Sequence, residues 1–132
     1  MHPCGNWHDR MDLVAQNQAD CYFLGPMDIR LCVDKITEQN KAGKARCKAM
    51  NGNIGAATPS TTDGKTALPY ASTLNQSTPE QIEAESKEVI KVTEDSGLRC
   101  ILGPNCWAPA QVPFVNIDTV TYSARKYGTF AQ

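Results

Sequence analysis

The sequence predicts a mainly α-helical protein with long irregular segments, built on an antiparallel helical hairpin that disulfide bridges hold together. Three observations support this fold class: six cysteines in 132 residues, two apolar stripes at helical spacing, and one later segment with strong helix-start signals. In chain order, we expect a disulfide-stapled hairpin over 1–50, an extended linker over 51–77, a docked helix over 78–96, and a stapled turn with an extended tail over 97–132.

The hairpin prediction depends on where the first four cysteines lie relative to the Gly-Pro pair at 25–26. Proline cannot continue an incoming helix, but it suits the first turn of the next one. Cys21 and Cys32 flank this bend closely, so they would meet near it in an antiparallel pair. Cys4 lies about as far before the bend as Cys47 lies after it, so these two cysteines would meet at the open end of the hairpin.

The apolar pattern is an independent feature of the sequence, and it supports this pairing. Residues at steps of three and four fall along one helical stripe in each segment. The stripes are Cys4, Trp7, Met11, Val14, Gln18 and Cys21 in the first segment, and Ile29, Cys32, Ile36, Gln39, Gly43, Cys47 and Met50 in the second. The four cysteines therefore lie on the predicted seam between the helices.

The last two cysteines predict a third, local bridge. Cys100 and Cys106 bracket Gly103-Pro104-Asn105, which are residue types that favour a tight turn. Six cysteines permit many other connectivities. The alternative is that some of them are reduced and act as small buried apolar residues.

Paired helices bridged through Cys4, Cys21, Cys32 and Cys47, in a chain with no presequence pattern after Met1, resemble the coiled-coil-helix-coiled-coil-helix proteins. The cysteine intervals here are longer than those typical of that family. The resemblance implies oxidative folding in the mitochondrial intermembrane space. It also implies a non-catalytic accessory or structural subunit of a larger assembly, such as a respiratory-chain complex, whose partners are other protein subunits.

The remaining chain divides into a linker and one well-marked helix. Residues 51–77 are rich in small residues and proline and show no periodicity, which predicts an extended segment. Thr78 is a suitable N-cap, Pro79 suits the first helical position, and Gln81 can close a capping box. Gly97 is placed to end this helix, which has a narrow apolar face for docking.

The C-terminal tail contains a β-prone stretch from Phe114 to Tyr122 and several aromatic residues. Aromatic side chains on a tail with little core of its own favour burial against a partner. The predicted partner-binding residues are Trp107, Phe114, Tyr122, Tyr127 and Phe130.

Composition excludes several function classes. The net charge is −1 and there is no long basic run, so we expect no nucleic-acid binding. No stretch is apolar enough for a transmembrane segment. No residue set identifies a reaction, and we expect no catalytic residue, metal or cofactor.

Three alternatives remain open. A small secreted disulfide-rich binding or effector protein would be consistent with the glycosylation sequon that begins at Asn75. A viral or filament structural subunit would also depend on its neighbours. A small enzyme would require a free Cys4 next to His8, at a spacing that places both on one helical face.

Overall fold

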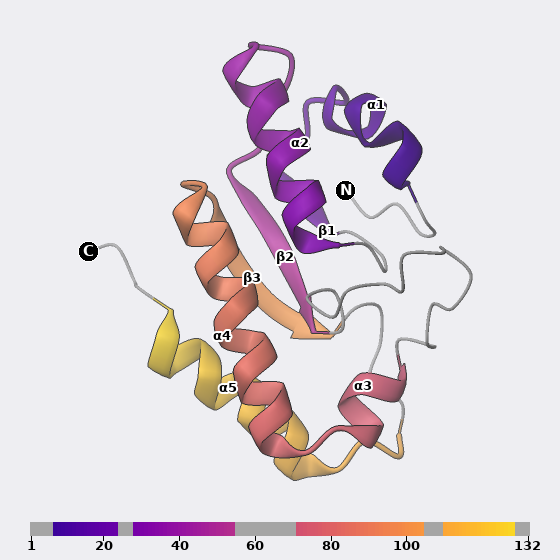
Figure 1. Cartoon of the computed structure of the whole chain (residues 1–132), viewed down its shortest axis with the longest axis vertical. Helices are drawn as coiled ribbons and strands as arrows, with labels where there is room; N and C mark the ends of the chain where they lie inside the picture. Colours follow the sequence, from indigo (N-terminus) through magenta and orange to yellow (C-terminus); the bar gives the residue numbers. More distant parts are fainter. Residues whose placement is uncertain (1–6, 24–27, 55–70, 105–109, 129–132) are drawn as a thin grey trace.

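The computed structural model describes residues 7–23, 28–54, 71–104 and 110–128. One or two helical segments precede each strand along the chain, and a last helix follows the third strand (Figure 1). The elements are the 3-10 helix η1 (His8–Arg10), α1 (Met11–Ala15), β1 (Cys21–Phe23), α2 (Ile29–Lys41), β2 (Ala49–Ile54), α3 (Ala71–Gln76), α4 (Pro79–Asp95), β3 (Arg99–Pro104) and α5 (Phe114–Tyr127). The fold is therefore mixed α/β.

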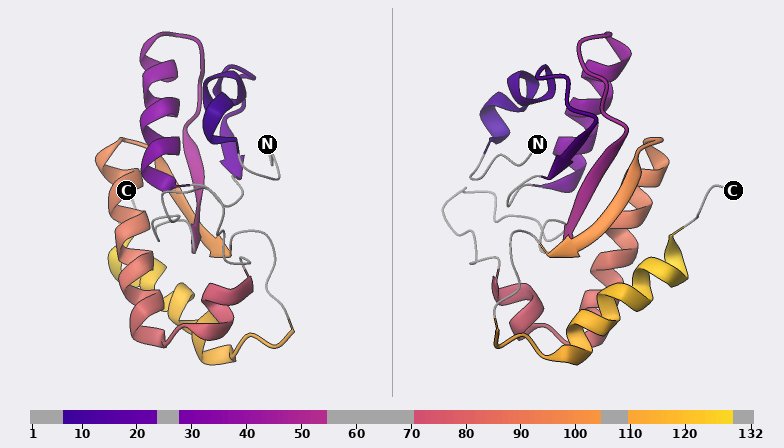
Figure 2. Two further views of the ribbon diagram at one scale, coloured as in Figure 1. Left: turned by 45° about the vertical axis from the view of Figure 1, so that its right-hand side comes forward. Right: turned by 180° about the vertical axis from the view of Figure 1, so that it is seen from behind.

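The strands form one parallel sheet in the order β1-β2-β3. Parallel neighbours cannot be joined by a tight turn, and here α2 and α4 each occur in a connection between consecutive strands. Crossovers of one hand between consecutive strands place both helices on the same face of the sheet. Figures 1 and 2 show α2 and α4 side by side on that face.

The main core lies between this face and the two helices. The strand register aligns Tyr22 with Met50 and Met50 with Cys100, so these three side chains point to the same side. Tyr22 and Met50 are fully buried there. The cluster includes Met11, Val14, Ala15, Ile29, Cys32, Val33, Ile36, Ala45, Cys47, Val89 and Leu98.

Phe23, Asn51 and Ile101 are aligned on the opposite face of the sheet. Asn51 is buried there, Phe23 is half-buried, and Ile101 keeps 53% of its surface exposed, so this face is covered unevenly.

The predicted disulfide-stapled hairpin over 1–50 is wrong. Helix α1 ends at Ala15, and the segment containing Cys21 forms β1 instead of continuing a helix. Helix α2 ends at Lys41, and Gly43 has a φ of 71°, a left-handed conformation that stops a helix. The chain then turns back into β2, so the apolar residues that suggested a long second helix are divided between a helix and a strand.

The predicted disulfide bridges are also wrong where the structure describes their cysteines. Cys32 is a free thiol buried within the core, so it does not bridge to Cys21. Cys47 is likewise a free thiol, and the described part of the chain contains no disulfide. Cys4 and Cys106, the other two predicted partners, lie outside the described residues. Hydrophobic burial, and not covalent stapling, accounts for the positions of Cys32 and Cys47.

The C-terminal region also differs from the prediction. Residues expected to form a stapled turn lie largely in β3, and the expected extended tail contains α5. The linker predicted over 51–77 includes the end of β2 and the short helix α3, while residues 55–70 lie outside the described part.

Helix α4 forms where the sequence pattern indicates it. Thr78 Oγ1 accepts a hydrogen bond from Gln81 N at 3.4 Å, and Thr78 N donates to Gln81 Oε1 at 2.9 Å. These two bonds close the capping box, and Pro79 occupies the first turn. Gly97 has a φ of 76° just beyond the last turn, as the helix-end signal requires.

Candidate functional site

Helix α5 packs beside α4 and also contacts α3 and β3. Its first turns are held by Asn116, which is almost completely buried. The Asn116 side-chain amide donates to the carbonyl oxygens of Leu74 at 2.6 Å and Ser77 at 3.0 Å. These bonds join α5 to the end of α3 and to the connection before α4, so they fix which side of α5 faces inward.

The other end of α5 is held by Glu83 of α4. Lys126 Nζ donates to Glu83 Oε1 at 2.8 Å, and the Tyr127 hydroxyl donates to the same oxygen at 2.6 Å. The hydrogen bond from Lys126, followed by that from Tyr127, lowers the pKa of the Glu83 carboxyl, and the bond to Glu83 raises the pKa of Lys126. Both groups are therefore charged at neutral pH, so the Lys126–Glu83 contact is an ion pair there.

The side of α5 that faces away from these anchors is apolar. Phe114 is 85% exposed, Val115 55%, Ile117 39% and Tyr122 53%. We call this surface the outer α5 face; it consists of Phe114, Val115, Ile117 and Tyr122 together with Asp118, Thr121 and Arg125. A surface helix normally has its apolar stripe inward, whereas α5 buries Asn116 and Ser123 and exposes its larger apolar side chains.

The structure places only some of the predicted partner-binding residues on this surface. Phe114 and Tyr122 both lie on the outer α5 face. Tyr127 is half-buried and bonded to Glu83, so it anchors the helix. Trp107 and Phe130 lie outside the described residues.

Sequence reasoning missed Val115 and Ile117, as well as the charged Asp118 and Arg125. Residues 114, 118, 121 and 125 follow one another at helical steps of four, three and four. That spacing was the available signal, but the β-branched residues between Phe114 and Tyr122 favoured a strand interpretation.

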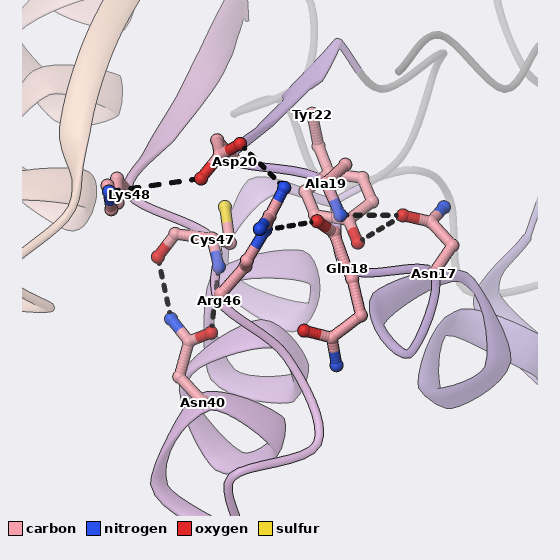
Figure 3. Close-up of polar contacts among 9 residues, drawn as sticks. All are labelled: Asn17, Gln18, Ala19, Asp20, Tyr22, Asn40, Arg46, Cys47 and Lys48. Atoms are coloured by element: carbon pink, nitrogen blue, oxygen red, sulfur yellow. Dashed lines mark hydrogen bonds and ion pairs between the residues drawn. The ribbon is translucent and has the colours of Figure 1, made fainter.

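A second polar cluster lies at the amino ends of β1 and β2 (Figure 3). Arg46 Nε donates to the carbonyl oxygen of Gln18 at 2.6 Å, and its Nη2 donates to Asp20 Oδ2 at 3.1 Å. Gln18, which has a φ of 65°, donates from its side chain to the carbonyl oxygen of Lys44 at 2.7 Å. These bonds tie the chain segment before β1 to the one before β2, which is a structural role.

Asn40 and Tyr22 complete this arrangement. The Asn40 side chain bonds both the N–H and the carbonyl of Cys47, at 2.9 and 2.8 Å. The buried Tyr22 hydroxyl contacts the carbonyl oxygens of Val14 and Ala15 and the Asn17 side chain, at 3.0 to 3.1 Å and 2.8 Å. The polar groups of the cluster thus satisfy one another within the chain.

A groove of about 530 Å³ lies between α2 and α4. Its lining includes two basic residues, Arg30 and Lys41, and three acidic residues, Asp34, Glu38 and Asp95. Arg30 is already paired with Glu88. Because charges of both signs line the groove, it favours no single class of charged ligand.

The described residues contain no group of three or more His, Cys, Asp or Glu side chains placed to hold a metal ion. No helix among them is long and apolar enough to cross a membrane. Cys4 lies outside the described part, so its pairing with His8 stays a prediction.

Comparison of the chain with protein-family models, curated proteins and solved structures found no match.

Proposed function

We propose that the protein is a non-catalytic subunit of a larger protein assembly and that the outer α5 face docks on a neighbouring protein. The observation that carries this proposal is the orientation of α5. Asn116 holds the start of α5 and Glu83 holds its end. With the helix held in this position, Phe114 keeps 85% of its surface exposed.

The chemistry of the surface supports a protein partner. Burying one large apolar side chain contributes roughly 1.5–3 kcal/mol, and the outer α5 face offers four such side chains from one helix. Two of them, Phe114 and Tyr122, are aromatic, the class of side chain that often anchors interfaces. Apolar residues grouped on one surface are typical of an interaction site.

The location of the assembly stays a prediction. The mitochondrial intermembrane space follows from the family resemblance, and a secreted protein is its alternative. Asn75 is exposed on α3 and could accept a glycan. The mass of the Asn75 peptide from the native source, before and after glycosidase treatment, distinguishes these two locations.

Replacing Phe114 by Asp tests the proposed function. We expect the wild-type chain to migrate in its native source with a mass far above 14.4 kDa, and the Phe114→Asp variant to dissociate. The expected loss of affinity is at least about tenfold, because about 1.4 kcal/mol corresponds to that factor. Native size separation of the tagged full-length chain measures it.

Leu13→Asp is the matched control, because Leu13 is 69% exposed on α1, away from the outer α5 face. Circular dichroism verifies that both variants are folded. Equal assembly masses for the wild type and the Phe114→Asp variant would contradict the proposal.

A further inference from the structure

We infer that the outer α5 face binds a second copy of this chain, with the two α5 helices antiparallel across a twofold axis. This inference rests on the proposed function and names the partner for the same surface. The arrangement of charge along the helix distinguishes a second copy from an unrelated partner.

The central line of the outer α5 face reads Phe114, Asp118, Thr121 and Arg125. Steps of four, three and four residues keep these side chains on one side of a helix. Asp118 and Arg125 are therefore separated by two turns, or about 10.5 Å at a rise of about 1.5 Å per residue. Ile117 and Tyr122 flank the line with exposed apolar surface.

A twofold interface must be self-complementary, so that each contact between two residues occurs twice. An axis that crosses α5 between residues 121 and 122 places Asp118 opposite Arg125 of the second copy. The same axis places Arg125 opposite Asp118 of the second copy. The outer α5 face thus matches itself in charge without any further residue.

The opposite orientation does not give this match. Two α5 helices running parallel in register would bring Asp118 against Asp118 and Arg125 against Arg125, which are like charges. The antiparallel arrangement also opposes the two helix dipoles favourably. The charge pattern therefore selects one orientation, while the apolar side chains provide the contact area.

Both charged groups are available for this contact. Asp118 and Arg125 are exposed, and neither takes part in any ion pair within the described residues. The adjacent Lys126, in contrast, is already paired with Glu83.

A charge exchange tests this inference. The full chain is studied by sedimentation equilibrium over a wide concentration range, with a reducing agent present so that no intermolecular disulfide contributes. We expect the wild type to form a dimer. Asp118→Arg alone and Arg125→Asp alone each place like charges across the axis, and each should weaken the dimer at least tenfold.

The double variant Asp118→Arg/Arg125→Asp should restore the dimer to within about threefold of the wild type, because the opposite charges meet again. Lys41→Asp, a single charge reversal at the exposed end of α2, should leave the dimer unchanged. Rescue by the double variant is a result that misfolding of the single variants cannot produce.

Two outcomes overturn the inference. One is a wild-type chain that stays monomeric at every concentration, and the other is a dimer that the single reversals do not weaken or the double variant does not restore. Either result leaves the proposed function standing if Phe114→Asp still releases the chain from its native assembly, since the partner is then a different protein.

Discussion

Burial is the main reason why the Cys32 and Cys47 thiols should react slowly. Burial raises the pKa of the Cys32 thiol to about 12, with a smaller contribution from the Asp28 carboxylate. Burial is also the main cause that raises the pKa of the Cys47 thiol to about 11. Because both values lie above the ordinary value near 9, the thiols stabilise the fold below pH 9, and this contribution is lost as the pH rises through about 11 and 12.

We expect Cys32 and Cys47 to resist alkylation by iodoacetamide at pH 8 in the folded protein and to react rapidly once urea unfolds it. The reagent attacks the thiolate, and the raised pKa values together with burial keep the thiolate fraction and its accessibility low. Peptide mass mapping of the native and unfolded samples measures the difference.

The same peptide mass map tests whether Cys32 forms a disulfide bridge. A disulfide-linked peptide containing Cys32, or complete alkylation of Cys32 before unfolding, would contradict this account.

Helices α4 and α5 show which elements the sequence could predict. The start of α4 is encoded by neighbouring residues, since Thr78, Pro79 and Gln81 satisfy the first turn without help from the rest of the chain. The inward side of α5 carries Asn116 and Ser123, so the usual apolar stripe is missing there. Its helical form depends on packing against α4, which overrides the β-propensity of its residues.

Thr78→Ala removes the N-cap of α4 and should lower the free energy of unfolding by about 1 kcal/mol, within the range of about 0.5–2 kcal/mol for a lost N-cap. The variant loses the bond from Gln81 N to the threonine hydroxyl. Urea titration followed by circular dichroism measures the change.

Thr119→Ala is the matched control, because the Thr119 hydroxyl is exposed and bonds only within α5, to the Val115 carbonyl oxygen. We expect this control to be neutral or slightly stabilising. An equal destabilisation by both variants would show that the cap is not responsible.

At the scale of the whole molecule, the arrangement of the strands and helices is the feature that the sequence predicts least well. A parallel sheet has no hairpin turn to mark it in the sequence, and β1 is only three residues long. The cysteines were interpreted as staples because their spacing fits a helical seam, whereas Cys32 and Cys47 belong to a hydrophobic core assembled from distant segments. Phe114 and Tyr122, which the aromatic content of the tail singled out as partner-binding residues, are exposed on α5, and only the helix relates them to Asp118 and Arg125.

Met50 tests the burial of the central strand. It is fully buried there, so Met50→Ala should lower the free energy of unfolding by about 2–5 kcal/mol. Leu13→Ala, at an exposed position, should change it by less than about 0.5 kcal/mol.

Urea denaturation of both variants measures this contrast. Similar small effects at positions 50 and 13 would count against the buried central strand.

The connectivity of the sheet has a consequence for how the chain folds. Each pair of neighbouring strands is separated in sequence by a complete helix, so no sheet hydrogen bond can form before a long loop has closed. Helices α2 and α4 can begin locally, from the caps at Asp28 and Thr78, well before the strands meet. Folding should therefore be slow for a chain of this size, with the ladder between β2 and β3 closing the longest loop. Until it closes, both strands have unpaired backbone groups, and this is the stage at which the newly made chain is most prone to aggregate.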